Sequence, residues 1–383
     1  MKVLVTGGAG FIGSFVVDRL LAAGCAVRVL DRLDPQVHPQ GRPAYLPAAA
    51  TLVVGDVRDR AACDAALADV DAVVHAAAAV GVGQSLYEIE HYVDVNARGT
   101  ATLLEAISRR PAPLRKLVLF TSMTGYGEGV YRRPSDGALV RVGLRTAADI
   151  ERGGWEPRCP DTGEVLEQAP TPESAALLAR NVYALTKRWQ EELAFSVGGV
   201  YGFPVVCLRL FNVYGPRQTL GNPYTGVLAI FLTRLLSGER PVVYEDGAQT
   251  RDFVSVHDVA ALAVAVLDGV AADGHAVNVG SGVPRRIVDI AETLAELADR
   301  RDLKPVVTGR FRSGDVRHCT ADVARARRML AFHPRVTWED GLAELLAWCR
   351  SAAASDRFGV AEDELRRHGL LTEPLAAAPG KVG

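Results

Sequence analysis

The chain has no dominant charge, no closely spaced cysteines and no long apolar run. Its 43 basic and 45 acidic residues leave a net charge of −2, which gives no electrostatic footprint for nucleic acid or an anionic membrane. No stretch approaches the length that spans a bilayer, and the apolar pattern starts at residue 2, so we expect a cytoplasmic protein without a signal peptide. The spacing of the six cysteines predicts reduced, mostly buried thiols: Cys25, Cys63, Cys159, Cys207, Cys319 and Cys349.

The first 31 residues carry a strong local pattern. A short apolar run, Lys2-Val-Leu-Val-Thr6, breaks at a glycine-rich turn, a helical pattern follows, and a second apolar run ends on Asp31. A strand, a glycine turn, a helix and a second strand with a terminal acid form the βαβ unit that binds dinucleotides. Gly7 allows the tight turn, Gly10 lets the pyrophosphate approach the backbone, and Gly13 lets the helix pack on the strand. The helix N-terminus offers its free amide groups to the phosphates.

Asp31 lies 31 − 7 = 24 positions after Gly7, close to the spacing at which an acid bonds the ribose hydroxyls. A carboxylate there repels a 2′-phosphate, so the pattern favours NAD over NADP. Arg32 beside it leaves NADP open as an alternative. A glycine-rich turn that binds nothing is the other interpretation, but the surrounding strands and helix favour a cofactor site.

Strand and helix signals alternate, which predicts an α/β fold with a doubly wound parallel (Rossmann) sheet and a smaller C-terminal lobe. We expect an NAD-binding domain over residues 1–200, to which segments around 204–216 and 250–262 return. Residues 217–350 then form a mainly substrate-binding lobe, and 351–383 a peripheral tail. Helices are expected over 86–108, 173–197, 223–237 and 360–369, and strands near 241–245 and 276–279.

Three side chains form a candidate catalytic group. Tyr183 and Lys187 stand at i and i+4 of a predicted helix, so both lie on one face. An ammonium one turn away, together with the positive charge of NAD⁺, would stabilise the phenolate and lower the tyrosine pKa. Ser122 ends a predicted strand, where ligands bind in doubly wound sheets, and could bond the same substrate oxygen. Alone, the tyrosine and lysine would be an ordinary surface pair.

With these motifs the sequence resembles the extended short-chain dehydrogenase/reductase family, in particular its nucleotide-sugar epimerases and dehydratases. Within that group it is similar to 4-epimerases of the dTDP-L-rhamnose and UDP-glucose types. The resemblance runs from residue 1 to about 350 and is interrupted at 131–172. Further motifs that carry it are Gly55-Asp-Val57, His75-Ala-Ala-Ala78, Asn96-Ala-Arg-Gly-Thr100, Arg209-Leu-Phe-Asn-Val-Tyr-Gly-Pro216, Gln249-Thr-Arg-Asp-Phe-Val254 and Arg312-Ser-Gly-Asp315.

The resemblance implies roles for individual residues. Asp56 and Val57 would contact adenine, and Asn212 and Arg251 would hold the diphosphate of a nucleotide sugar, whose charge a guanidinium fork neutralises well. The implied cofactor residues are Gly7, Gly10, Phe11, Ile12, Gly13, Asp31, Arg32, Asp56, Val57, Ala76, Ala77, Ala78, Asn96, Tyr183 and Lys187. The implied substrate residues are Ser122, Asn212, Tyr244, Arg251, Arg312 and Asp315, with Asn222-Pro-Tyr224 and Val242-Val-Tyr244 beside the base. We interpret His75 as a core histidine.

The resemblance implies a shared first step, in which Tyr183 takes the proton of the sugar 4-hydroxyl while C4 gives hydride to NAD⁺. Dehydratases of the family carry an Asp-Glu pair after the strand-end residue, where this chain has Met123-Thr124. Decarboxylases carry a glutamate in the same turn, whereas the nearest acid here is Glu128. We therefore expect 4-epimerisation of a dTDP- or UDP-hexose, and a dTDP-6-deoxyhexose in particular. A decarboxylase, a dehydratase, a 4-ketoreductase and a non-catalytic NAD-binding regulator remain alternatives.

Residues 131–172 lengthen the interval between Ser122 and Tyr183 to 183 − 122 = 61 positions. We expect this insertion to cover the sugar, with a plain surface excursion as the alternative. Its Trp155-to-Gly163 stretch resembles a cysteine-knuckle turn without a second cysteine, so we predict no metal. Family members commonly dimerise through two helices of each chain. We expect a homodimer formed by the helices at 86–108 and 173–197.

Overall fold

The computed structural model describes residues 1–220, 226–352, 356 and 358–375 and has a seven-stranded parallel sheet at its centre. The strand order is β13-β9-β5-β4-β1-β2-β3. From β1 the chain first adds β2 and β3 on one side, and it then crosses to the other side of β1 to add β4, β5, β9 and β13. Such a reversal opens a crevice at the carboxyl ends of the strands, where ligands bind. The strands are β1 (Lys2–Thr6), β2 (Ala26–Asp31), β3 (Thr51–Val54), β4 (Ala72–His75), β5 (Lys116–Ser122), β9 (Val205–Leu210) and β13 (His275–Val279).

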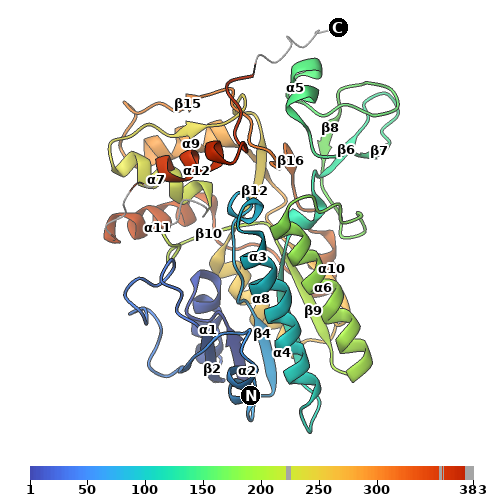
Figure 1. Cartoon of the computed structure of the whole chain (residues 1–383), viewed down its shortest axis with the longest axis vertical. Helices are drawn as coiled ribbons and strands as arrows, with labels where there is room; N and C mark the ends of the chain where they lie inside the picture. The colour runs from blue at the N-terminus through green and yellow to red at the C-terminus, as the bar shows by residue number, and fades with distance from the viewer. Residues whose placement is uncertain (221–225, 353–355, 357, 376–383) are drawn as a thin grey trace.

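Helices cover both faces of this sheet (Figure 1). Alternation along β1 explains the two layers: Val3 and Val5 face one apolar cluster, and Leu4 faces the other. The first cluster contains α1 (Phe11–Ala22) and α8 (Val256–Asp268), and α10 (Ala324–Leu330) lies beside β13. The second contains α2 (Arg60–Leu67), α4 (Gly99–Ser108) and α6 (Val182–Tyr201). The doubly wound sheet predicted from the sequence is confirmed.

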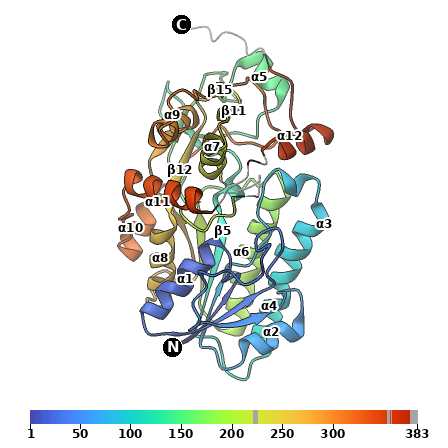
Figure 2. The same ribbon diagram turned by 90° about the vertical axis from the view of Figure 1, so that its left-hand side faces the viewer.

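The C-terminal lobe stacks on the carboxyl edge of the sheet (Figure 2). Its apolar cluster joins α7 (Val227–Leu236), α9 (Ile287–Leu297) and α11 (Trp338–Ser351). Two small sheets complete it. One contains β10 (Asn212–Tyr214), β12 (Thr250–Ser255), β14 (Pro284–Arg286) and β16 (His318–Cys319), and the other pairs β11 (Val242–Val243) with β15 (Val306–Val307).

The insertion has its own small fold. A three-stranded sheet is formed by β6 (Val130–Arg132), β7 (Leu139–Arg141) and β8 (Glu167–Ala169), and α5 (Ala147–Gly153) lies between β7 and β8 in the chain. The insertion is anchored to the C-terminal lobe by a backbone hydrogen bond from the Thr171 N–H to the Thr320 carbonyl at 2.8 Å, and by side chains described below. The last described helix is α12 (Phe358–Arg367), and an irregular segment follows it to residue 375.

Several boundaries differ from the sequence predictions. The predicted helix 173–197 begins only at Val182, because the Asn181 side chain caps it by accepting the Ala184 N–H at 2.8 Å. The predicted helix 86–108 consists of η1 (Gln84–Leu86), α3 (Ile89–Tyr92), the π-helical η2 (Val93–Arg98) and α4. The segment 250–262 is predicted to return to the NAD-binding domain. Its helix α8 packs in the apolar cluster of that domain, whereas its strand β12 belongs to another sheet. Of the predicted helix 223–237, residues 223–225 lie outside the described part.

Candidate active site

The glycine turn after β1 forms a tight cradle. Gly7 has φ +68°, and a Cβ at this position would lie 2.7 Å from the backbone nitrogen of Ala77. A Cβ on Gly13 would lie 2.2 Å from the Gly7 carbonyl oxygen, so α1 can approach the turn only without a side chain there. Gly10 precedes α1 and has no side chain to accept its first amide groups. The cradle therefore fits a dinucleotide pyrophosphate, which would lie against the N-terminus of α1.

Asp31 and Arg32 lie at the carboxyl end of β2. The Asp31 carboxylate accepts the backbone N–H of Ala9 at 3.0 Å and that of Leu33 at 2.9 Å, which fixes its orientation. The Arg32 guanidinium is paired with Asp34, and it lies 3.6 Å from Asp56. Because two carboxylates already neutralise Arg32, this guanidinium is not an unpaired cation for a 2′-phosphate. The oriented Asp31 carboxylate and the paired Arg32 guanidinium therefore fit NAD, as the position of Asp31 in the sequence predicts.

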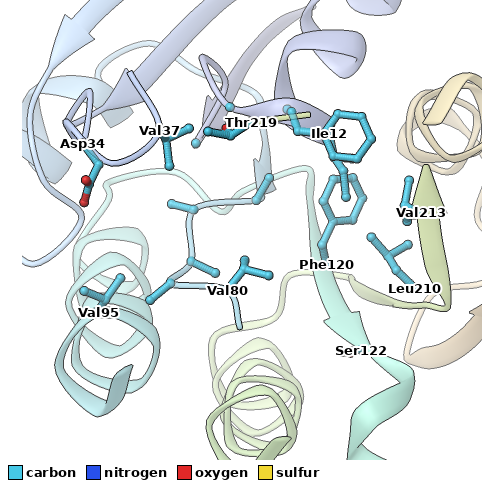
Figure 3. A pocket seen from close by; sticks show the side chains of 18 of the residues that line it. Ile12, Asp34, Val37, Val80, Val95, Phe120, Ser122, Leu210, Val213 and Thr219 are labelled. Carbon is cyan, nitrogen blue, oxygen red and sulfur yellow. The ribbon is translucent and has the colours of Figure 1, made fainter. Parts of the chain in front are cut away.

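A cavity of about 410 Å³ runs along the carboxyl ends of β1, β2, β4 and β5 (Figure 3). Apolar side chains surround it, among them Ile12 from α1, Phe120 from β5 and Val80 from the segment after β4. The predicted residues that line it are Gly7, Gly10, Phe11, Ile12, Gly13, Asp31, Arg32, Asp56, Val57, Ala76, Ala77, Ala78, Ser122, Tyr183, Lys187 and Asn212. The sheet thus brings most of the cofactor and catalytic candidates into one cavity.

Asn96 is a predicted cofactor residue that is not among the cavity-lining residues. It is fully buried in η2, where its side chain pairs with both backbone groups of Ala79 at 2.8 and 3.1 Å and donates to Thr186 at 3.0 Å. These bonds fix the end of the alanine segment that lines the cavity against helix α6. Asp56 does line the cavity, and burial, which raises its pKa, is outweighed by hydrogen bonds from Arg58, so that the net shift is downward.

The three catalytic candidates meet at the end of β5. Tyr183 lies in the first turn of α6, and its backbone N–H donates to the Ser85 hydroxyl at 3.1 Å. The Lys187 ammonium donates to the Phe120 carbonyl at 3.1 Å. Burial raises the pKa of Tyr183 to about 12, an effect that the hydrogen bond with Ser122 only partly offsets. Burial also lowers the pKa of Lys187 to about 7.

The sequence predicts a lowered tyrosine pKa for Lys187 and NAD⁺ together, whereas these shifts describe the protein without NAD⁺. The physical reason is that both side chains are taken out of water, which favours the neutral form of each. By its own groups the chain therefore keeps the Tyr183 phenol protonated at pH 7. A cation placed in the cavity beside the phenol would lower the pKa of Tyr183 again, and the nicotinamide of NAD⁺ carries such a charge.

Lys187 gives a pH-dependent prediction for nucleotide-free protein. Above pH 7 the native lysine has lost a proton that the unfolded chain keeps up to about pH 10.4, so the unfolded state binds more protons. The free energy of unfolding should therefore rise by about 2 kcal/mol between pH 7 and 9 through this group. Lys187→Met should remove that rise, as measured by urea titrations at both pH values. If the free energy of unfolding of Lys187→Met rose between pH 7 and 9 as much as that of the wild type, the buried position of the ammonium would be contradicted.

Two polar residues near this group were not singled out from the sequence. Thr124 donates its hydroxyl to the Ser122 oxygen at 3.0 Å and its backbone N–H to the same atom at 3.2 Å, which orients Ser122. Ser85 is fully buried and fixes the start of α6 through Tyr183. The sequence holds no signal for Ser85, because it acts across 98 positions of the chain.

His75 is a buried core histidine, as interpreted from the sequence. Its two ring nitrogens lie 2.6 Å from the Thr6 hydroxyl and 2.9 Å from that of Thr100. Burial, with a smaller contribution from the charge of Lys187, lowers its pKa to about 3. The ring is therefore neutral at physiological pH. In the described part of the chain, no cluster of three or more His, Cys, Asp or Glu side chains could hold a metal ion.

The remaining substrate candidates divide into separate groups. Asn212 lines the cavity and donates to the Asp252 carbonyl at 2.9 Å. Arg251 is not a lining residue; its guanidinium donates to the carbonyls of Thr250 at 2.8 Å and Arg317 at 3.1 Å. Tyr224, expected beside the base, lies outside the described residues.

A second group lies in the C-terminal lobe. Arg312 makes two hydrogen bonds to Asp315, at 2.8 and 2.9 Å, and its guanidinium carbon lies 5.9 Å from the centre of the Tyr244 ring. The structure thus brings these three candidates together, but they do not line the cavity that holds Ser122 and Tyr183.

Glu128, the nearest acid after Ser122, is buried in an ion network away from the cavity lining. Its carboxylate accepts the backbone N–H of Arg317 at 2.9 and 3.0 Å and lies 3.3 Å from the Arg145 guanidinium. Arg317 has no exposed surface. Its guanidinium contacts Glu156 at 3.0 Å, Glu245 at 2.8 Å and Asp246 at 2.6 Å. The network joins the insertion to the C-terminal lobe.

No residue of the insertion 131–172 is among those that line the cavity, so its expected position over the sugar stays a prediction. Its charged side chains explain its position. Arg145 pairs with Glu245 at 2.9 Å, and Glu156 bonds His318 at 2.9 Å. Burial raises the pKa of Glu156, but hydrogen bonds from His318 and Arg317 outweigh it and lower the pKa to about 2. The insertion is therefore held beside Tyr244 and its neighbours.

The six cysteines are free, and five of them are buried, which confirms the prediction of buried thiols. A search of the described helices for one that is long and apolar enough to cross a membrane finds none.

Comparisons with known proteins agree with this geometry. The model of the NAD-dependent epimerase/dehydratase family matches residues 3–141 and 160–280. Residues 142–159, between the two segments that the family model matches, are the part of the insertion that carries Arg145 and Glu156. A dTDP-L-rhamnose 4-epimerase of Burkholderia thailandensis is 38% identical over 356 residues, which cover 91% of this chain and 94% of that protein.

Two solved structures resemble the whole fold. The UDP-glucose 4-epimerase of Thermotoga maritima with UDP-glucose has a TM-score of 0.75 at 28% identity, over 92% of this chain and 100% of that one. The UDP-glucose 4-epimerase of Thermus thermophilus in complex with NAD has a TM-score of 0.72 at 28% identity and the same coverage. With a matching family model, a fold shared over nine-tenths of its length and a dinucleotide cradle, the chain belongs to the NAD-dependent epimerase/dehydratase family.

Proposed function

We propose that the chain is an NAD-dependent 4-epimerase of a nucleotide-diphosphate hexose, with a dTDP-6-deoxyhexose as the first candidate substrate and a UDP-hexose as the second. The distribution of carboxylates carries the proposal. Among the described residues that line the cavity, the only carboxylates are Asp31, Asp34 and Asp56, all at the carboxyl ends of β2 and β3. Glu128 is paired elsewhere. Elimination or decarboxylation therefore lacks an acid beside Ser122.

The residues of the site have the following parts in this reaction. NAD held in the cradle of Gly7, Gly10 and Gly13 would supply the acceptor for the C4 hydride and the donor for its return to the opposite face. Tyr183 would act as the phenolate, whose oxygen takes the proton of the sugar 4-hydroxyl and becomes the phenol, and the Ser122 hydroxyl, held by Thr124, would bond the same sugar oxygen. Lys187, one helical turn after Tyr183 and bonded to the Phe120 carbonyl, would supply positive charge when protonated. The apolar lining from Ile12 and the buried Phe120 would limit the access of water to the reacting atoms.

A panel of dTDP- and UDP-hexoses tests the proposal, with products identified by NMR and mass spectrometry. We expect inversion at C4 with no net change in absorbance at 340 nm. A 4-ketoreductase would consume NADPH stoichiometrically, a decarboxylase would release CO₂, a dehydratase would lose water, and a regulator would convert nothing. Each of these results would overturn the proposed reaction.

We also propose a homodimer formed through α6 and the α3–η2 helices. Leu185 and Trp189 stand one turn apart on α6 and are 50% and 45% exposed. Ile89 and Val93, on the helices that pack beside α6, are 53% and 45% exposed. An apolar strip of this kind is favourable when a second copy covers it. The cytoplasmic location stays a prediction from the sequence.

A double variant tests the dimer. Leu185→Glu with Trp189→Glu places two charges in the proposed contact, so we expect the mass measured by light scattering to halve. Val200→Glu, at an exposed apolar position near the end of the same helix, is the matched control and should leave the mass unchanged. A wild-type protein with monomer mass would contradict the proposal directly.

A further inference from the structure

The segment 358–375, expected to be peripheral, packs against both lobes. Ala361 and Leu365 of α12 are buried, and so is Leu371 after it. Both views of the molecule place α12 above α3, at the boundary between the C-terminal lobe and the Rossmann domain (Figures 1 and 2). The sequence signalled only a short helix here, because its contacts are all with distant parts of the chain.

This segment pairs with the loop that carries Arg312. Residues 309–313 and 370–375 run side by side, with an antiparallel bridge between Arg312 and Leu371. The hydrogen bonds are Ser313 N–H to Leu370 O at 2.9 Å, Thr372 N–H to Phe311 O at 3.0 Å, Leu375 N–H to Gly309 O at 2.8 Å and Phe311 N–H to the Thr372 hydroxyl at 2.9 Å. The backbone on both sides of Arg312 is therefore fixed by residues 370–375.

Side chains of α12 extend this contact to Tyr244. The Phe358 ring lies 6.3 Å from the Tyr244 ring, between centroids, and Glu362 pairs with Arg310 at 2.9 Å. Because the Arg312 guanidinium also lies over the Tyr244 ring, α12 holds together the residues that the family resemblance assigns to the nucleotide.

The opposite end of α12 contacts the Rossmann domain through Tyr87. The Tyr87 hydroxyl donates to the Glu364 carboxylate at 2.8 Å, and the Tyr87 ring stacks on His368 at 4.5 Å with an interplanar angle of 2°. A Cβ built on Gly314 would lie 3.9 Å from Leu86, so the Arg312 loop itself reaches the same segment. Within that segment, Gln84 lines the cavity and Ser85 bonds the Tyr183 backbone.

We propose that residues 358–375 form a clamp that holds the Arg312 loop against residues 84–87 and so sets the affinity for the nucleoside diphosphate part of the substrate. Tyr87, Glu364 and His368 are then positioning residues, since they act through the loop and not on the reacting atoms. The proposal rests on the proposed function, because it takes a nucleotide sugar as the substrate. Proton transfer at Tyr183 does not depend on the clamp.

The test removes the contact with Tyr87 and keeps α12 in place. In the double variant Glu364→Ala, His368→Ala we expect the Kd for UDP and for dTDP, measured calorimetrically on the NAD-loaded enzyme, to rise about tenfold or more. KM for the sugar nucleotide should rise with it, while kcat, bound NAD and Tm stay close to the wild-type values. Hydrogen exchange in residues 309–315 should become faster in the variant.

Tyr87→Phe keeps the ring that stacks on His368 and loses the hydroxyl bond to Glu364, so its Kd should fall between those of the wild type and the double variant. Arg367→Ala, an exposed change on the same helix, is the control and should bind as the wild type does. If the double variant bound UDP and dTDP with the wild-type Kd, the clamp would be overturned and the proposed function would not. The clamp would also be overturned if the variant lost bound NAD, or had a lower Tm, to the same extent as it lost affinity. Failure of the wild-type enzyme to bind either nucleotide would overturn the proposed function as well.

Discussion

Tyr183→Phe is expected to lower turnover by about 10²–10⁴-fold while NAD stays bound, because the variant loses the group that exchanges a proton with the sugar 4-hydroxyl. The phenylalanine ring keeps the packing of a side chain that is only 8% exposed in the first turn of α6. The measurement is kcat on the preferred hexose nucleotide, with the NAD content determined after denaturation.

The matched control is Tyr201→Phe, the same chemical change at an exposed position on the same helix. It should leave kcat and NAD content unchanged. If Tyr183→Phe turned over at a near-normal rate, the phenol would have no part in the proton transfer. A loss of bound NAD with the activity would point instead to a structural role for the hydroxyl.

Arg317→Met is expected to lower the free energy of unfolding by about 3–5 kcal/mol, the cost of leaving buried charges without their partner. The guanidinium has no exposed surface and contacts three carboxylates, and its own backbone N–H bonds Glu128. Without the Arg317 guanidinium, the Glu245 carboxylate keeps its ion pair with Arg145 and loses the one with residue 317. Denaturant titration of the NAD-loaded protein measures the change.

The surface pair of Arg366 and Glu362, 3.3 Å apart on α12, provides the comparison. Arg366→Met removes the same functional group from a solvated site, so the free energy of unfolding should hardly change. Equal stability of Arg317→Met and the wild type would show that the insertion does not depend on this network.

Local patterns predicted the fold because each part of the NAD-binding unit is contiguous in sequence. The glycine turn, the strand before it and the acid at residue 31 fall within one βαβ unit, and their spacing is set by backbone geometry. The serine at the end of β5 and the tyrosine and lysine on α6 are far apart in sequence and could be placed together for a different reason. Parallel strands meet at one edge of the sheet, so their last residues share a cavity.

Interactions across long stretches of chain could not be predicted. Glu128 was the nearest acid to the predicted catalytic group, but only the structure places it against Arg317, which lies 189 positions later. The contact of Tyr87 with Glu364 spans 277 positions, so the tail had no visible partner. The pKa of Tyr183 shows the same limit: spacing indicated a neighbouring ammonium, whereas burial, which depends on all surrounding elements, dominates the shift.

The central claim is that C4 of the sugar is oxidised and reduced again within one site, and a deuterium-labelled substrate tests it most directly. A dTDP- or UDP-hexose that carries deuterium at C4 is mixed with the enzyme, the reaction is stopped during turnover, and the released cofactor and product are weighed by mass spectrometry. The account predicts a deuterated fraction of reduced cofactor, a primary isotope effect on turnover and a C4-inverted product that keeps its deuterium. An unlabelled cofactor throughout a conversion that shows no isotope effect would contradict it.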